Sequence, residues 1–380
     1  MSAFQVRRGA SRAREAEVAV AELHAALAQP NCELVLFYCS PDYDKDALAR
    51  ALAAKFPGVQ VVGCTTAGEI GPLGYVEGSL SGVSLAGEGL RVASLRLDDL
   101  RGFEPAHAAT ATRALLAQLE RSGVVPSGDN TFGFLLIDGL CGLEEIVVSS
   151  LFRNLGDIQL VGGSAGDGQR FGGTFIYHDG KFCQDAAVFL LVQTRSKFEV
   201  FKTQHFERAT EKMVVTGADP ARRIVTEING EPAGREYARV VGVEVDQLTP
   251  MVFGCHPVVV RMGGQDYVRS IQKVNEDGSL TFFCAIDEGI VLTTARRVDL
   301  VENLEHMFSG IRTRIGAPAI VLGCDCILRH LECEQRGEID RVGQIYRDNN
   351  VIGFATYGEQ YNAMHVNQTF TGVAISSEAP

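Results

Sequence analysis

Hydrophobic residues in this chain occur in short runs of strand length, and stretches with helical periodicity separate many of these runs. Residues 32–39 and 59–64 predict buried strands, and residues 44–56 between them predict a helix that Pro57-Gly58 ends. A strand–helix–strand order of this kind is typical of parallel strands joined by a right-handed crossover. The order recurs at 131–138, 143–155 and 158–161, and again at 319–323, 327–347 and 351–357.

Shorter β-rich segments follow the first two units and continue into the second half of the chain. Residues 79–85 and 90–97 predict a hairpin around Gly87-Glu-Gly89, and residues 174–177 and 182–192 predict another. Beyond a boundary near 227–233, the pattern predicts helices at 235–245 and 300–315, an antiparallel meander at 252–262, 267–274 and 280–286, and a last strand at 368–375. We therefore predict an α/β fold of mixed α+β character, in which repeated strand–helix–strand plus hairpin units form layered mixed sheets flanked by helices. Two domains are expected, an internally duplicated one at 1–232 and a second at 233–380.

One nine-residue segment occurs twice. Val61-Val-Gly-Cys-Thr-Thr-Ala-Gly-Glu69 reappears as Val351-Ile-Gly-Phe-Ala-Thr-Tyr-Gly-Glu359, and Leu160-Val-Gly-Gly-Ser-Ala-Gly-Asp167 is a looser copy with one residue deleted. Such repeats indicate repeated structural units. Each copy is an apolar strand that ends in a glycine-rich turn with a carboxylate. The turns lack the spacing of a nucleotide-binding loop, so they either shape another pocket or stabilise themselves.

Composition narrows the class of protein. The chain has 380 residues, 46% of them hydrophobic, and a net charge of -12. A surface this acidic is repelled by nucleic acid and by anionic membranes, so neither is an expected partner. No secretory signal and no apolar run of membrane-spanning length is evident, which favours the cytoplasm. Most of the 10 cysteines lie in apolar runs and are expected to be small core residues.

Two of the 8 histidines lie in informative surroundings. His256 follows an apolar stretch that contains Phe253, and His365 lies between Met364 and Asn367, just beyond the second copy of the repeat. A neutral imidazole in an apolar pocket is what a haem iron needs as its proximal ligand. A hydrogen-bonded core histidine is the alternative for each of them.

A Cys/His cluster offers a different chemistry. Cys326, His330 and Cys333 fall at i, i+4 and i+7 of the predicted helix and so share one face. Two thiols and an imidazole are suitable ligands for zinc or iron. The set lacks a fourth ligand and a CxxC pair, and the alternative is a helix whose cysteines pack at the margin of the core.

The repeated motifs resemble those of FIST-domain sensory proteins. Residues 61–70 and 161–167 resemble the N-terminal module of that family, and residues 357–361 with 367–369 resemble the end of its C-terminal module. Together these modules would cover nearly the whole chain. Within the family, residues 364–375 are most similar to the NosP group of bacterial nitric-oxide-sensing haemoproteins.

This resemblance implies a ligand-binding sensor that carries haem b, binds nitric oxide and modulates a partner histidine kinase. His365 or His256 would then hold the iron, with Phe253, Phe354, Met364 and Asn367 nearby. A haem-free sensor of small metabolites such as amino acids would instead use a pocket with Glu359, Tyr357, Glu69 and Asp167. A metal or redox switch at Cys326, His330 and Cys333 is a third hypothesis. No catalytic motif is present, so an enzyme is not expected, and a homodimer is compatible with the sequence.

Overall fold

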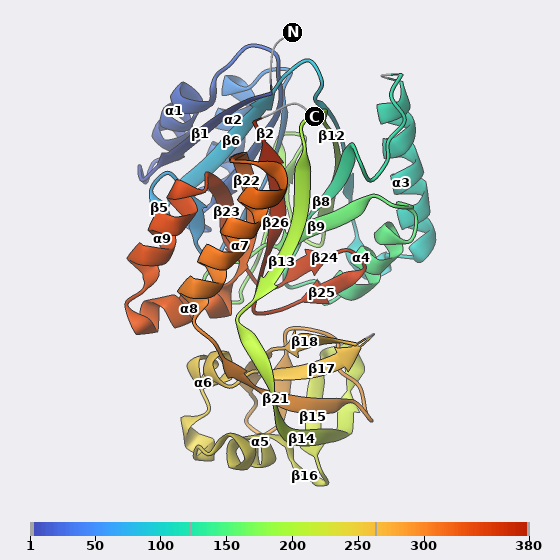
Figure 1. Ribbon diagram of the computed structural model, residues 1–380, viewed down its shortest axis with the longest axis vertical. Coiled ribbons are helices and arrows are strands. Elements are labelled where there is room, and N and C mark those ends of the chain that lie inside the picture. The colour runs from blue at the N-terminus through green and yellow to red at the C-terminus, as the bar shows by residue number, and fades with distance from the viewer. Residues whose placement is uncertain (1–3, 122, 263, 378–380) are drawn as a thin grey trace.

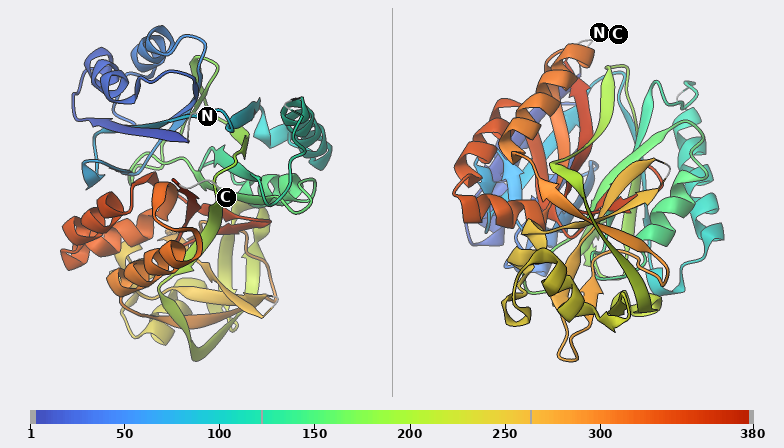
Figure 2. Two further views of the ribbon diagram at one scale, coloured as in Figure 1. Left: turned by 45° about the horizontal axis from the view of Figure 1, so that its top comes forward. Right: turned by 60° about the horizontal axis from the view of Figure 1, so that its bottom comes forward.

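The computed structural model describes residues 4–121, 123–262 and 264–377, and the strands of these residues form four sheets. Three of the sheets have equivalent strand orders and belong to three similar units around a shared centre, coloured blue, green and orange-red in Figure 2. The fourth sheet belongs to a smaller domain, which Figure 1 shows below the three units. We call these parts units 1, 2 and 3, in chain order, and the small domain.

Unit 1 alternates strands and helices, then forms a hairpin and a return strand. The side chain of Asp44 caps α2 by accepting a hydrogen bond from the Ala47 N–H at 2.8 Å. Apolar residues of both helices pack against one face of the sheet. The elements are β1 (Gln5–Ser11), α1 (Ala16–Leu27), β2 (Cys32–Cys39), α2 (Lys45–Lys55), β3 (Gln60–Thr65), β4 (Glu69–Gly71), β5 (Gly74–Val76) and β6 (Leu80–Ala86).

Unit 2 repeats this order. Its two helices cover the outer face of their sheet, where they meet Leu135, Ile137 and Phe189. The elements are β7 (Arg91–Leu97), η1 (Leu100–Gly102), α3 (Pro105–Glu120), β8 (Thr131–Ile137), α4 (Glu144–Phe152), β9 (Gln159–Ser164), β10 (Ile176–His178), β11 (Lys181–Cys183) and β12 (Ala187–Gln193).

Unit 3 has the same order but is interrupted by the small domain after its first strand. Helix α7 begins where Asp299 accepts a hydrogen bond from the Glu302 N–H at 2.8 Å, and Gly316 follows its last residue. The elements are β13 (Phe198–Gln204), α7 (Leu300–Ile315), β22 (Pro318–Cys326), α8 (Ile327–Arg336), α9 (Ile339–Asp348), β23 (Val351–Thr356), β24 (Glu359–Tyr361), β25 (Met364–Val366) and β26 (Thr369–Ser376).

The small domain lies between β13 and α7 in the chain. The boundary expected at 232 falls inside it, between β16 and α5. Its elements are β14 (Phe206–Asp219), η2 (Pro220–Arg222), β15 (Ile224–Ile228), β16 (Glu231–Pro232), α5 (Ala233–Val241), η3 (Val245–Gln247), α6 (Pro250–Cys255), β17 (Val258–Met262), β18 (Gln265–Arg269), β19 (Ile271–Val274), β20 (Leu280–Phe282) and β21 (Val291–Arg297).

Each unit lends its hairpin to the sheet of another unit. The hairpin β4–β5 of unit 1 pairs with β23 of unit 3, β10–β11 of unit 2 pairs with β3 of unit 1, and β24–β25 of unit 3 pairs with β9 of unit 2. This cyclic exchange ties the three units together by backbone hydrogen bonds. It also brings each hairpin beside helices of a different unit.

The repeated sequence segment forms the strand that precedes each hairpin. Strands β3, β9 and β23 each run parallel to the strand before the preceding helix, as the pattern predicted. A Cβ atom on Gly63, Gly162 or Gly353 would lie 2.5, 2.1 or 2.0 Å from a carbonyl oxygen of the neighbouring strand. The shared glycine of the repeat is therefore explained by close strand approach.

Two sequence-based predictions are wrong. The expected hairpin at 79–97 does not form, because β6 pairs with β1 and β2 whereas β7 pairs with β12 in another sheet. The expected strand at 252–262 begins instead as helix α6, since Thr249 caps it and Pro250 occupies its first turn. Apolar runs of this length do not by themselves distinguish a strand from a short buried helix.

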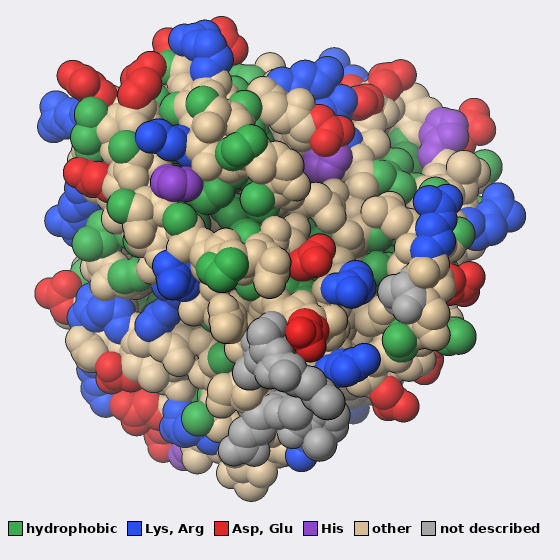
Figure 3. Space-filling view, turned by 90° about the horizontal axis from the view of Figure 1, so that it is seen from above, with side chains coloured by type: hydrophobic (Ala, Val, Ile, Leu, Met, Phe, Trp, Pro, Cys, Tyr) green, Lys and Arg blue, Asp and Glu red, His purple; other side chains and the backbone are tan. Residues whose placement is uncertain are grey.

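The end of the molecule that carries both termini has mixed charge. Acidic and basic side chains are interspersed over this face, so it is not a surface of one sign (Figure 3). Among the residues that the structure describes, no helix is long and apolar enough to cross a membrane.

Candidate ligand site at the hairpin of unit 3

Two copies of the repeated segment end in the same buried carboxylate turn. Glu69 accepts hydrogen bonds from the Thr66 hydroxyl and from the Ser79 N–H and hydroxyl, at 2.5, 2.8 and 2.7 Å. Glu359 accepts from the hydroxyl groups of Thr356 and Thr369 and from the Thr369 N–H. Burial raises the pKa of Glu69 to about 7 and that of Glu359 to about 8. Both side chains therefore stabilise their turns.

Asp167 in the looser copy has a different role. It accepts hydrogen bonds from three backbone N–H groups of its own loop, those of Phe171, Gly172 and Gly173, at 2.8 to 2.9 Å. The Tyr357 hydroxyl also donates to Asp167. These bonds outweigh burial and lower the pKa of Asp167. The carboxylate therefore orders the loop that joins the end of β9 to the hairpin of unit 2.

The hairpin of unit 3 is more polar than that of unit 1. Its strand β25 contacts α4 of unit 2 and β18 of the small domain, and we call this region the hairpin-3 junction. His365 is 2% exposed and lies 3.4 Å from the Gln360 side-chain nitrogen. A Cβ atom on Gly358 would lie 2.5 Å from His365 Nε2 and 3.0 Å from Asn367 Nδ2, so both side chains cover this glycine.

Several buried polar atoms at the hairpin-3 junction have no hydrogen-bond partner among the described residues. They are both side-chain polar atoms of Asn367 and the side-chain oxygen of Gln360, and neither residue is exposed. On the small domain, Nε and Nη1 of Arg269 and the hydroxyl of Ser270 are also unpartnered and buried. Leaving one such group unpaired costs about 1–3 kcal/mol, so this concentration requires an explanation.

Charged side chains fasten the small domain over this junction. Arg223 donates hydrogen bonds to Glu144 at 2.6 Å and to Glu145 at 2.5 Å, both at the start of α4. Glu145 also accepts a hydrogen bond from the Ala285 N–H at 2.6 Å. The two carboxylates come from unit 2 and their partners from the small domain, so these contacts hold the two parts together.

The electrostatic surroundings keep His365 neutral. Burial lowers the pKa of its imidazole, Glu145 and Glu144 act in the opposite direction, and Arg223 and Arg269 lower it further. A neutral imidazole can accept a hydrogen bond at one nitrogen and donate at the other. The hairpin-3 junction thus combines buried amide groups with a buried imidazole, and Arg269 is close enough to lower the pKa of that imidazole.

The other residues expected around a haem lie in separate places. Phe354 stacks on Tyr38 in the central core at a centroid distance of 4.6 Å. Phe253 belongs to the core of the small domain, and His256 lies exposed at the end of α6. Met364 lies next to His365 on β25 and is partly buried. Of the residues expected to bind haem, only His365, Met364 and Asn367 lie together, the first two on β25 and Asn367 directly after it.

The Cys/His set is also separated. Cys326 and Cys333 lie in a hydrophobic cluster, where burial raises the pKa of Cys326 well above its usual value and that of Cys333 to about 12. His330 instead faces Glu77 and Glu334. Within the described part of the chain, the two thiols and the imidazole do not form one ligand group.

Sequence reasoning missed most of the charged residues at the hairpin-3 junction. Arg269 ends β18 and Ser270 follows it, with no distinctive motif, and Arg223 directly follows the short helix η2. The adjacent pair Glu144-Glu145 at the start of a predicted helix was the one available signal. It was ambiguous, because acidic residues at this position commonly stabilise the helix itself. Their second role depends on a domain about 80 residues further along the chain.

A small domain closed over a polar junction at the carboxyl ends of parallel strands is an arrangement typical of ligand-binding proteins. The FIST N domain model matches residues 33–231 and the FIST C domain model matches residues 233–362. This chain therefore belongs to the FIST-domain family, whose domains are ligand-binding sensory domains of signal transduction and are generally not enzymes.

One relative is an uncharacterised protein, MJ1623, of the archaeon Methanocaldococcus jannaschii. The two sequences are 23% identical over 280 residues, which cover 64% of this chain and 54% of that protein. The chain thus spans about half the length of this relative. The alignment does not identify a ligand.

Proposed function

We propose that this protein is a sensor that binds a small metabolite with a carboxylate and an amino group, such as an amino acid, at the hairpin-3 junction. The observation that carries the proposal is the group of buried, unpartnered polar atoms on Arg269, Asn367 and Gln360. A ligand that pairs with these atoms would remove a cost that the ligand-free protein bears.

The chemistry of these atoms suggests how the ligand is recognised. Nε and Nη1 of Arg269 are positively charged donors, and each can donate a hydrogen bond to a carboxylate oxygen. The free side-chain oxygens of Gln360 and Asn367 are acceptors for an ammonium group. A ligand with both groups would satisfy both sides of the junction at once.

Binding at this place would change the position of the small domain. The small domain joins unit 3 through the passages from β13 to β14 and from β21 to α7. We infer that loosening the contacts of Arg223 with Glu144 and Glu145 would open the buried site. A ligand that binds the closed state more tightly would shift the equilibrium toward closure, and a partner protein would read this change.

A thermal-shift screen tests the proposal. Purified protein is heated with a panel of amino acids and with their decarboxylated and deaminated analogues. A ligand at about 100 times its Kd should stabilise the protein by about 2.7 kcal/mol and raise Tm, and both truncated analogues should be weaker. Isothermal titration calorimetry then gives the affinity of each compound that raises Tm.

Two arginine variants locate the response. Arg269→Met should abolish the shift in Tm, because it removes the donors for the carboxylate. Arg8→Met is the matched control, since Arg8 also has an unpartnered, buried nitrogen but lies on β1 of unit 1. Equal loss in both variants, or no stabilising compound in the panel, would contradict the proposal.

Haem b with nitric oxide as ligand is the second proposal, supported by the neutral imidazole of His365. The residues around it do not fit a porphyrin in the closed arrangement. Nε2 of His365 packs over Gly358, and Glu144, Glu145, Arg223 and Arg269 surround the ring with charge. An absorption spectrum after haem addition, compared between the parent and His365→Ala, separates the proposals: a Soret band that depends on His365 would favour haem.

Modulation of a histidine kinase in the cytoplasm is the proposed output for either ligand. It rests on the family resemblance, and co-purification with a kinase whose autophosphorylation depends on the ligand would test it. Sedimentation of the same samples would test whether the protein forms a homodimer.

A further inference from the structure

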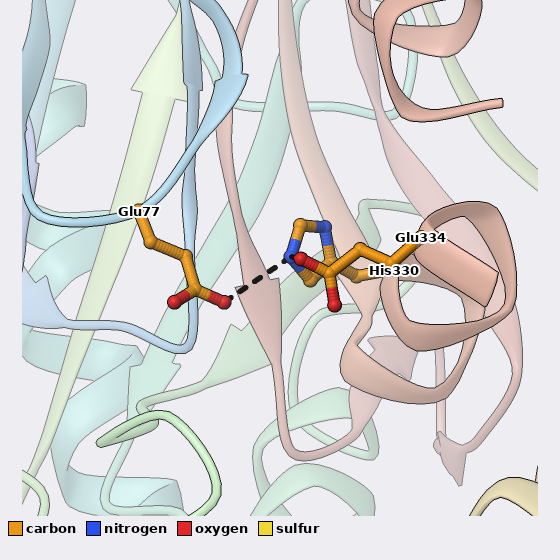
Figure 4. Close-up of side chains that lie close together, drawn as sticks. All are labelled: Glu77, His330 and Glu334. Carbon is orange, nitrogen blue, oxygen red and sulfur yellow. Dashed lines mark hydrogen bonds and ion pairs between the residues drawn. The ribbon is translucent and has the colours of Figure 1, made fainter. Parts of the chain in front are cut away.

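A second polar group lies where the hairpin of unit 1 meets α8 and α9 of unit 3, a region we call the hairpin-1 junction. Glu77 follows β5, and His330 and Glu334 are four residues apart on α8. Their ligand atoms all lie within 4.8 Å of one another. Figure 4 shows the imidazole edge turned toward both carboxylates.

We propose that Glu77, His330 and Glu334 bind one divalent transition-metal ion, and that zinc is the ion. One imidazole nitrogen and two carboxylate oxygens are ligands that zinc accepts, with a fourth position left for water. This site differs from the expected Cys/His set, because only His330 is common to both.

The distances suit a bridging ion better than direct ion pairs. His330 Nε2 lies 3.3 Å from the Glu77 oxygen and 3.5 Å from the Glu334 oxygen. Charge-assisted hydrogen bonds between such groups are usually about 2.7–2.9 Å long. Two ligand atoms held by zinc at tetrahedral angles are separated by about 3.4 Å, given bonds of about 2.0–2.2 Å.

The imidazole is held in place while the carboxylates remain accessible. His330 is 2% exposed and packs against the Tyr75 ring at a centroid distance of 4.3 Å. The side chains of Glu77 and Glu334 are 61% and 47% exposed. Glu77 also lines a surface cavity of about 820 Å³, so an ion and its water can enter from solvent.

An ion here would link two units that are distant in sequence. Glu77 belongs to the exchanged hairpin of unit 1 and the other two ligands belong to unit 3. Because the ion would bind only the folded arrangement of these three groups, it should stabilise the junction and raise Tm in proportion to its occupancy.

The test is a zinc titration of chelator-treated protein against a chromophoric competitor. We expect one tight site per chain, a rise in Tm with zinc, and at least a tenfold loss of affinity in Glu77→Gln/Glu334→Gln. Both positions are exposed, so this variant should fold, and its circular dichroism spectrum and its Tm without metal verify that it does. The matched control is Glu88→Gln/Glu276→Gln, two exposed carboxylates outside the group, which should bind zinc like the parent.

Cobalt substitution identifies the ligand type. Bound by one imidazole and two carboxylates, the first equivalent of Co²⁺ should give weak visible bands without thiolate-to-cobalt charge transfer. A strong thiolate band would overturn the proposal, and so would zinc affinity that is unchanged in the Glu77/Glu334 variant. The proposed amino acid response should persist in that variant, because the hairpin-3 junction is a separate place.

Discussion

The hairpins of units 1 and 3 begin from the same turn but meet different surroundings. In both, a buried glutamate accepts hydrogen bonds from a threonine three residues before it and from a serine or threonine ten residues after it. The strand pairing makes Tyr75 equivalent to His365, and the next positions make Glu77 equivalent to Asn367. Equivalent positions in the two hairpins therefore contribute residues to both candidate sites.

The two junctions differ in what covers them. At the hairpin-1 junction the carboxylates of Glu77 and Glu334 are exposed to solvent, whereas His330 beneath them is buried. The hairpin-3 junction lies under the small domain, where Asn367 is fully buried and unpartnered. The comparison teaches that the repeated turn fixes where the side chains of each hairpin lie, whereas the domain inserted in unit 3 buries those of hairpin 3. Burial makes an unpaired polar group costly in free energy.

The largest expected effect tests whether the two turns are equivalent. Glu69→Ala and Glu359→Ala each leave a buried backbone N–H and hydroxyl groups without their acceptor. Each should lower the free energy of unfolding by about 3 kcal/mol, measured by denaturant titration at neutral pH. A large difference between the two changes in unfolding free energy would show that the two turns are not equivalent. Glu33→Ala, a partly exposed carboxylate on β2, is the control and should change stability little.

The pH dependence of stability sharpens the same comparison. Burial raises the pKa of Glu69 to about 7 and that of Glu359 to about 8, so the folded protein holds these protons more tightly than the unfolded chain does. The stabilisation is fully present below the unfolded pKa near 4.5 and is lost as pH rises through about 7 and 8.

Each glutamate adds at most about 1.4 kcal/mol per pH unit to this decline. Glu69→Gln should remove the part that ends near pH 7, and Glu359→Gln the part that extends to about pH 8. Denaturant titrations between pH 5 and pH 9 measure the slopes. Unchanged slopes in both variants would show that the carboxylates titrate alike in the folded and unfolded chain.

The smallest expected effect concerns the position where the two hairpins differ most. Asn367→Leu replaces an unpartnered buried amide by an apolar group of similar volume. It should raise the stability of the ligand-free protein by about 1 kcal/mol and at the same time abolish ligand stabilisation. Asn349→Leu is a control, because Asn349 is buried and donates to the Ile345 carbonyl at 2.8 Å, so the loss of its amide should destabilise the protein. Loss of stability in Asn367→Leu would mean that the amide has a partner in the ligand-free protein.

Much of the fold follows from local patterns in the sequence. The strand–helix–strand order predicted the parallel pairs β2–β3, β8–β9 and β22–β23, and helix α7 has the expected bounds of 300–315. The repeat predicted equivalent units, and its shared glycine reflects a close contact between adjacent strands. These features depend on residues that are neighbours in the chain or on a strand pair joined by one helical connection.

Only the tertiary structure decided how the hairpins are exchanged and what lies over them. No local pattern places β4 beside β23 or separates β6 from β7, because strand partners are chosen by the burial of whole faces. The sequence by itself indicated the family and the repeat, and it predicted a ligand site in the segment after Glu359. It did not associate Arg269 with His365 or Glu77 with His330, since the energy of a buried polar group depends on what surrounds it in space.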